Sequence, residues 1–279
     1  MASLDGRVAI VTGAGRMRGL GRGMALALAR GGADVVVNAR PRSPDSFPDH
    51  EKEAGWKGAA SVAEEIVALG RKAVAVDADV TSGDDVERLV SRTVEELGRL
   101  DVLVNNAGLA TVSGGKNLWE MDEVDWRREI DVNLTGVFLC CKAAAKVLID
   151  RGEGGRVINI SSLAGVRAQP QYGGYTPSKF GVNGLTQMLA LEMAPHKVTV
   201  NSVCPGSADT DMMDGTFNRT ADRMRLTYDQ IKAGAKGFIP LGRQAEVSEI
   251  ASMVAYLASP EAGYITGQVI CVDGGVGLR

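Results

Sequence analysis

Short runs rich in valine and isoleucine alternate with longer helical patterns along the whole chain. These runs are continuously apolar, which is typical of strands in a parallel sheet that is covered on both faces. Parallel strands need crossover connections, so the alternation predicts a doubly wound α/β fold with helices on both faces. The expected strands are Val8–Val11, Val35–Asn38, Ala73–Val76, Val102–Asn105, Val157–Ser161, Val198–Val203 and Val269–Val272, and the expected helices lie near 20–30, 59–69, 83–97, 122–150, 175–194 and 246–258.

Two segments interrupt this alternation, but no repeat or linker divides the chain, so we expect a single domain over 1–279. Residues 41–58 are polar and contain three prolines, which excludes a strand. We interpret them as an insertion after the second strand, of open function. Residues 207–240 follow the sixth strand, and we interpret them as a substrate lid rather than a plain surface loop.

Charge and cysteine content exclude several classes of function. The net charge of −3 gives no electrostatic reason to expect nucleic acid or an anionic membrane as a partner. The four cysteines lack zinc-ligand spacing and are expected to be buried, reduced thiols, and no metal site is predicted. We expect His50 and His196 to be surface residues. We recognise no signal peptide and no apolar run of transmembrane length, so the predicted location is the cytoplasm.

A glycine-rich turn follows the first strand, with the sequence Thr12-Gly13-Ala14-Gly15-Arg16-Met17-Arg18-Gly19-Leu20-Gly21. Glycines allow a sharp turn and a close approach to phosphate, and the N-terminus of the following helix offers free N–H groups and partial positive charge. Glycine also marks ordinary turns between strands and helices, so this feature is a weak signal by itself. It predicts a dinucleotide site only together with the residues described next.

Tyr175 and Lys179 are four residues apart and therefore share one face of a helix. Pro177 between them places the pair in the first turn of that helix, beside the carboxyl edge of the sheet. We expect the positive charges of Lys179, a bound nicotinamide and the helix end to lower the pKa of Tyr175, which suits a proton donor for carbonyl reduction. Ser162 ends the fifth strand, and Asn133 lies upstream on a separate helix.

Together these motifs resemble those of the short-chain dehydrogenase/reductase family, over nearly the whole chain. The family pattern Thr-Gly-x-x-x-Gly-x-Gly matches from Thr12 with two extra residues, which leaves open whether Gly13 or Gly15 makes the closest backbone approach. Asn105-Asn106-Ala107-Gly108 resembles the family's Asn-Asn-Ala-Gly signature, in which we expect Asn105 to be mainly structural. The resemblance implies a Rossmann-type sheet of about seven strands and a cofactor site made of Gly13, Gly15, Arg18, Gly19, Leu20, Gly21, Arg40, Asp79, Val80, Asn106, Ala107, Gly108, Tyr175, Lys179, Pro205, Gly206 and Thr210.

The resemblance also assigns roles in catalysis. Tyr175 would exchange a proton with the substrate oxygen, and Ser162 would position that oxygen. Lys179 would bind the nicotinamide ribose, and Asn133 would hold a water that links Lys179 to solvent. No zinc or other metal enters this scheme.

The end of the second strand favours NADP(H) over NAD(H). It reads Asn38-Ala39-Arg40, without the carboxylate that usually accepts hydrogen bonds from a plain ribose. Arg40 and Arg18 stand where relatives that prefer NADP carry basic residues, and a guanidinium matches a 2′-phosphate. The alternative is that both arginines are solvated surface charges.

These features predict an oxidoreductase that transfers a hydride between NADP(H) and a ketone or secondary alcohol. The same chemistry with NAD(H) is the first alternative, and a non-catalytic dinucleotide-sensing protein is the second. The expected partner is a small-molecule carbonyl or alcohol substrate, whose identity the sequence leaves open. The resemblance implies a homotetramer, or a homodimer, that assembles through the helices near 122–150 and 175–194.

Overall fold

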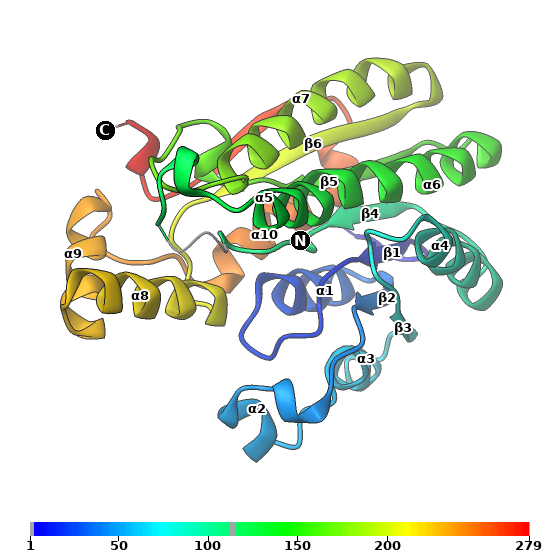
Figure 1. Cartoon of the computed structure of the whole chain (residues 1–279). Coiled ribbons are helices and arrows are strands. Elements are labelled where there is room, and N and C mark those ends of the chain that lie inside the picture. Colours follow the sequence, from blue (N-terminus) through cyan, green and yellow to red (C-terminus); the bar gives the residue numbers. More distant parts are fainter. Residues whose placement is uncertain (1–2, 112–114, 279) are drawn as a thin grey trace.

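The computed structural model describes residues 3–111 and 115–278. Within these residues the strands form one parallel seven-stranded sheet in the order β3-β2-β1-β4-β5-β6-β7 (Figure 1). This architecture confirms the predicted Rossmann-type fold. The strands are β1 (Val8–Val11), β2 (Asp34–Ala39), β3 (Ala73–Asp77), β4 (Val102–Asn105), β5 (Gly155–Ile160), β6 (Val198–Pro205) and β7 (Val269–Val272).

Helices cover both faces of the sheet, which explains why the strands are continuously apolar. Val35 and Val37 of β2 point into the core on one face, and Val36 between them points into the core on the other. Burying each such side chain contributes about 1.5–3 kcal/mol. The first face carries α1 (Leu20–Arg30), α3 (Ala59–Ala68) and α10 (Val247–Ala258), and the second carries α4 (Gly83–Leu97), α6 (Gly136–Arg151) and α7 (Tyr175–Met193).

Local signals in the sequence set the ends of these helices, as α4 illustrates. The Ser82 side chain accepts a hydrogen bond from the backbone N–H of Asp85, which caps the first turn. Gly98 adopts a left-handed conformation that ends the helix. Val86, Leu89, Val90 and Thr93 are buried at helical spacing, so a single face of α4 packs on the sheet.

The helix expected near 122–150 is interrupted by one wide turn. It consists of α5 (Glu123–Ile130), a π-helical turn (Asp131–Thr135) and α6. Contrary to the prediction that no apolar run reaches transmembrane length, the combined helix is long and apolar enough to span a membrane. Cys140, Cys141, Ala144 and Leu148 of α6 are nevertheless buried in the core cluster on the second face. It is therefore a core helix of the α/β fold.

The two interrupting segments both lie beyond the carboxyl ends of strands. The 41–58 segment is not a strand, as predicted, and holds a 3₁₀ turn (Pro44–Ser46) and α2 (Asp49–Glu53). The 207–240 segment folds into α8 (Asp211–Met224) and α9 (Tyr228–Phe238), which lie together at one end of the molecule (Figure 1).

The thiols differ in exposure. Cys140, Cys141 and Cys204 are buried, as expected, but Cys271 is exposed because it lies on β7 at the open edge of the sheet.

Candidate active site

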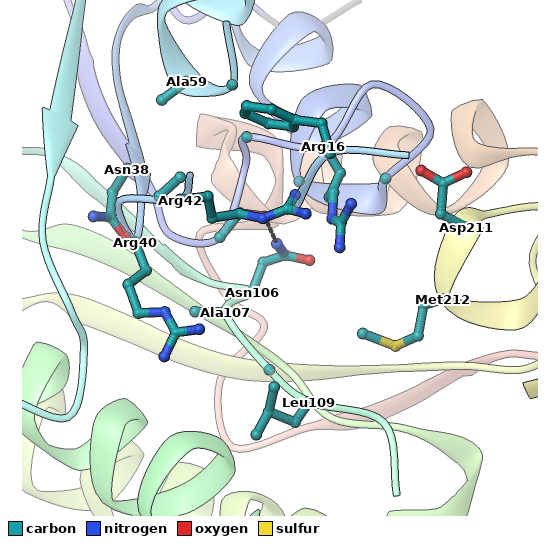
Figure 2. Close-up of a pocket in the computed structure, with 18 of the residues that line it drawn as sticks. Arg16, Asn38, Arg40, Arg42, Ala59, Asn106, Ala107, Leu109, Asp211 and Met212 are labelled. Atoms are coloured by element: carbon teal, nitrogen blue, oxygen red, sulfur yellow. Dashed lines mark hydrogen bonds between the residues drawn. The ribbon is translucent and has the colours of Figure 1, made fainter. Parts of the chain in front are cut away.

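A cavity of about 1240 Å³ lies at the carboxyl ends of β1, β2, β3 and β4 (Figure 2). It brings together most of the cofactor residues predicted from the sequence. Its lining includes Gly13, Gly15, Arg18, Gly19, Leu20, Gly21, Arg40, Asp79, Val80, Asn106, Ala107, Gly108 and Thr210. The other predicted residues lie outside this lining and comprise Asn133, Ser162, Tyr175, Lys179, Pro205 and Gly206.

The glycines of the turn lie so close to neighbouring groups that a larger side chain cannot fit. A Cβ on Gly13 would lie 2.6 Å from the Cα of Ala107, and one on Gly15 would lie 2.8 Å from the Cβ of Ala39. A Cβ on Gly21, in the first turn of α1, would lie 2.7 Å from the Cα of Ala14. Gly13 also has a φ of +65°, whereas Gly15 does not have positive φ. The bare backbone at the N-terminus of α1 thus forms a cradle that fits a pyrophosphate.

Thr12 and Asn106 tie the glycine turn to the end of β4. The Thr12 hydroxyl accepts hydrogen bonds from the backbone N–H groups of Asn106 and Ala107, both at 3.0 Å. The Asn106 amide donates to the carbonyls of Thr12 at 2.8 Å and Gly13 at 3.0 Å. Asn105 instead points into the sheet and donates to Asn159 of β5 at 2.8 Å, which agrees with the structural role expected for it.

The end of β6 approaches β7 closely. A Cβ on Gly206 would lie 2.8 Å from the Cα of Asp273. Thr210, in the cavity lining, is buried and caps α8 by accepting a hydrogen bond from the backbone N–H of Met213. Pro205 and Gly206 therefore shape the backbone that positions Thr210.

Ser162, Tyr175 and Lys179 form a cluster beside the cavity. Tyr175 is the first residue of α7, and its hydroxyl is hydrogen bonded to Ser162, which caps the turn after β5. The Lys179 ammonium lies 5.6 Å from the centre of the Tyr175 ring and donates to the Ile160 carbonyl at 2.9 Å. A Cβ on Gly108 would lie 3.6 Å from the Lys179 Nζ, so the cluster meets the cavity lining at Gly108.

Burial dominates the electrostatics of this cluster. It raises the pKa of Tyr175, although the hydrogen bond to Ser162 acts in the opposite direction. For the chain without a bound nicotinamide, the pKa of Tyr175 therefore shifts in the direction opposite to the lowering that is expected with the cofactor in place. Burial also lowers the pKa of Lys179 to about 8, because the side chain is only 4% exposed and a charged ammonium is poorly solvated there. With this pKa the Lys179 side chain is still mostly charged at pH 7.

Asn133 lies in the π-helical turn and is completely buried. Its side-chain oxygen accepts from the backbone N–H of Leu109 at 2.8 Å, and its amide donates to the Leu109 carbonyl at 3.1 Å. A Cβ on Gly108 would lie 3.1 Å from the same side-chain oxygen. The Asn133 side chain thus fixes the chain after β4, next to the Lys179 ammonium.

The end of the cavity that lies away from the Ser162–Tyr175–Lys179 cluster is basic. Arg40 follows β2 as predicted, and Arg16 and Arg42, which the sequence analysis did not select, also line the cavity (Figure 2). The pKa of Arg42 is lowered by burial and by the nearby positive charges of Arg16 and Arg40. Arg18 also lines the cavity, but its guanidinium is paired with Asp209, Asp211 and Asp214 at the start of the 207–240 segment.

The 41–58 segment supplies one wall of the cavity. The Trp56 indole N–H donates to the Gly15 carbonyl at 2.8 Å, and Glu51 accepts from the backbone N–H of Met17 at 2.8 Å. The lengthened glycine turn therefore contacts the inserted segment.

Comparisons with known proteins agree with this geometry. A family profile described as enoyl-(acyl carrier protein) reductase matches residues 13–277. A 3-oxoacyl-[acyl-carrier-protein] reductase of a Synechocystis strain is 41% identical over 277 residues, which cover 99% of each chain. A variant of actinorhodin polyketide ketoreductase, solved with NADPH, is 36% identical with a TM-score of 0.87, and the match covers 100% of both chains. Carveol dehydrogenase from Mycobacterium avium, solved with NAD, is 33% identical with a TM-score of 0.88, again over 100% of both chains. The chain therefore belongs to the short-chain dehydrogenase/reductase family and is an NAD(P)-dependent oxidoreductase of ketone or alcohol substrates.

Proposed function

We propose that the enzyme transfers a hydride between NADP(H) and a ketone or secondary alcohol, with Tyr175 as the proton donor and acceptor. The observation that carries this proposal is the contact of two sites at Gly108. The Ser162–Tyr175–Lys179 cluster lies on one side of this residue, and the glycine cradle lies on the other. Hydride transfer to a carbonyl requires a dinucleotide and a proton donor at adjacent positions.

The bound nicotinamide supplies or accepts the hydride, and the side chains of the cluster manage the proton. In reduction, the Tyr175 hydroxyl gives its proton to the substrate oxygen. Ser162 donates a hydrogen bond to the same oxygen and positions it. Lys179, 5.6 Å from the ring, stabilises the tyrosinate that results and binds the ribose hydroxyls. In oxidation the tyrosinate removes the proton from the alcohol.

Asn133, in the π-helical turn between α5 and α6, supports this arrangement. Its side chain holds Leu109 in place, so the backbone at Gly108 keeps its position between Lys179 and the cavity. We propose that Asn133 acts as a positioning residue, and that its place in a wide helical turn next to Lys179 also suits a bound water.

The preference for NADP(H) rests on the basic end of the cavity. Arg16, Arg40 and Arg42 converge there. Arg16 and Arg42 share the Glu51 carboxylate at 3.6 and 3.8 Å, and Arg40 lies 3.9 Å from Asp79. Burial, and then repulsion from Arg16 and Arg40, lower the pKa of Arg42, and an anion that binds among the guanidiniums relieves this repulsion. A 2′-phosphate provides that anion, whereas a plain ribose does not.

Titration of the full-length enzyme with NADPH and NADH, followed by nicotinamide fluorescence, tests the preference. We expect tighter binding of NADPH, and we expect Arg42→Gln to weaken NADPH about 10- to 100-fold, since a charge-assisted hydrogen bond contributes about 1.5–3 kcal/mol. NADH binding should change little. Arg243→Gln is the matched control, because Arg243 pairs with Glu249 away from the cavity. Equal affinities for both cofactors, or an equal loss for both in Arg42→Gln, would support the NAD(H) alternative.

Three further features complete the proposal. The 207–240 segment acts as a substrate lid, because Thr210, Met212 and Arg219 line the cavity from its first helix. The enzyme assembles as a homotetramer through α7, where Phe180, Met188 and Leu191 form an exposed apolar stripe. The working compartment is the cytoplasm, where the exposed Cys271 thiol stays reduced.

A further inference from the structure

Three side chains with metal-binding atoms meet where the 41–58 segment contacts the start of α8. His50 and Glu51 are neighbours on α2, and Asp211 is the first residue of α8. One ligand atom from each lies within 4.8 Å of the other two. The Nε2 of His50 and the Oδ2 of Asp211 are 3.4 Å apart. This cluster lies outside the Ser162–Tyr175–Lys179 site, and Asp211 also lines the cavity.

The atoms that face one another in this cluster are buried and lack hydrogen bonds. The His50 Nε2, the Glu51 Oε2 and the Asp211 Oδ2 are all shielded from solvent, and none has a hydrogen bond to any residue that the structure describes. The Glu51 side chain is fully buried, and its other oxygen accepts from the backbone N–H of Met17 at 2.8 Å. This bond fixes the carboxylate. Buried polar atoms are normally satisfied, so such a group indicates a missing ligand.

The surrounding charge permits a cation. Arg16 and Arg42 lie 3.6 and 3.8 Å from Glu51, beyond hydrogen-bond distance, so a lone pair of the carboxylate stays available. Glu51 and Asp211 bring two negative charges directly to the site, and Asp209 and Asp214 neutralise Arg18 beside it.

We propose that His50, Glu51 and Asp211 bind one divalent metal ion of the zinc class, which fastens the 41–58 segment to α8. An imidazole with two carboxylates suits Zn²⁺, whereas Mg²⁺ and Ca²⁺ prefer sites made only of oxygen ligands. Zinc–ligand bonds of about 2.0–2.1 Å place neighbouring tetrahedral ligands about 3.3 Å apart. The 3.4 Å between His50 and Asp211 matches this spacing. A small rotation of the Asp211 side chain completes a site with three protein ligands and one water.

Zinc binding to the full-length, chelator-treated protein tests the proposal. Titration with ZnCl₂ in a calorimeter should give one site per chain, and thermal unfolding should shift upward by several degrees because the ion binds only the folded state. Asp211→Asn and His50→Ala should each weaken zinc binding by at least about tenfold. The chain has only two histidines, so His196→Ala is a matched control that should bind zinc like the wild type. Cys271→Ser controls for the exposed thiol.

Two measurements keep the outcome decisive even if a variant unfolds. Anomalous diffraction at the zinc edge from wild-type crystals should place the ion between α2 and α8, and limited trypsin digestion of α8 and α9 should slow when zinc is added. The proposal is overturned if the wild type binds no zinc at micromolar concentration, if His50→Ala binds as tightly as the wild type, or if the affinity depends on His196 or Cys271. Density for a water alone at the site would also overturn it. Hydride transfer and cofactor preference are tested separately, by Tyr175→Phe and by Arg42→Gln.

Discussion

The guanidinium of Arg18 donates a hydrogen bond to the carboxylate of Asp214 across 2.9 Å and so joins the glycine turn to α8. The contact continues outward, because the Tyr228 hydroxyl of α9 donates to the second oxygen of Asp214 at 2.6 Å. The backbone N–H of Asp211 also donates to the Arg18 carbonyl at 3.0 Å. The residue that we first interpreted as a 2′-phosphate ligand is therefore engaged with the proposed lid.

Replacing Arg18 by glutamine should loosen the proposed lid more than it alters cofactor choice. Arg18 and its three carboxylates are partly exposed, so we expect a coupling of only about 0.5–1 kcal/mol in an Arg18/Asp214 double-mutant cycle. Trypsin should cleave α8 and α9 faster in Arg18→Gln, and KM for the carbonyl substrate should rise severalfold while the ratio of NADPH to NADH affinity stays constant. A selective loss of NADPH binding would instead restore Arg18 as a phosphate ligand.

Tyr175→Phe should lower kcat by about 10²–10⁴-fold, the usual contribution of a positioned proton donor. The affinity for NADPH should persist, because the ring and Lys179 remain in place. Tyr172→Phe is the matched control. The two rings are 6.2 Å apart, but the residue four positions after Tyr172 is Thr176, so Tyr172 has no lysine partner. Full turnover in Tyr175→Phe with a good substrate would remove the proton-donor assignment.

The sequence was sufficient for the fold because its strand signals are strong and local. All seven expected strands exist, with ends that differ by at most two residues, since apolar β-branched runs leave few alternatives once both faces are buried. The glycine cradle could also be predicted from the sequence, because only glycine tolerates the close approach of Gly13 to Ala107. Within the helix expected near 122–150, the wide turn at Asn133 was missed, because no residue type specifies a π-helical turn.

What the sequence could not supply depends on contacts between distant segments. His50 was expected at the surface, yet its Nε2 is buried against Asp211 of α8. Arg42 and Arg16 join Arg40 only because the 41–58 segment folds back over the glycine turn. The pKa of Tyr175 was predicted from charge alone, whereas burial, which only the fold reveals, acts more strongly.

Lys179→Met should stabilise the cofactor-free enzyme at neutral pH while abolishing most activity. The native pKa of Lys179 is about 8, below the value of about 10.4 for an unfolded chain. At pH values between these two pKa values, Lys179 is protonated in the unfolded state and largely neutral in the folded state. The free energy of unfolding of the wild type therefore rises as the pH increases through this range. The burial penalty is fully present below pH 8 and amounts to about 3 kcal/mol. Lys179→Met removes this penalty, but it also removes the hydrogen bond to the Ile160 carbonyl, which contributes about 1 kcal/mol to stability.

Urea unfolding at several pH values measures this effect. The variant should exceed the wild type by about 2 kcal/mol at pH 7, and the difference should shrink towards pH 10.5. Lys142→Met, on the exposed side of α6, is the control and should show no such trend. A variant that is less stable than the wild type at pH 7 would show that Lys179 is stabilising where it lies.

The Gly184→Ala substitution distinguishes the proposed tetramer from a monomer. Gly184 lies on α7 within the stripe of Phe180, Met188 and Leu191, and an added Cβ would meet no atom within 4 Å in the described parts of this chain. In a monomer the substitution should only stabilise, by about 0.5–1 kcal/mol, because alanine favours a helix over glycine. In the proposed tetramer the extra methyl group separates helices that pack closely at glycine, so sedimentation should show a shift towards smaller species. Gly234→Ala is the control, since Gly234 is similarly open but lies in α9. A tetramer that persists in Gly184→Ala with a gain in stability would exclude this stripe as the assembly surface.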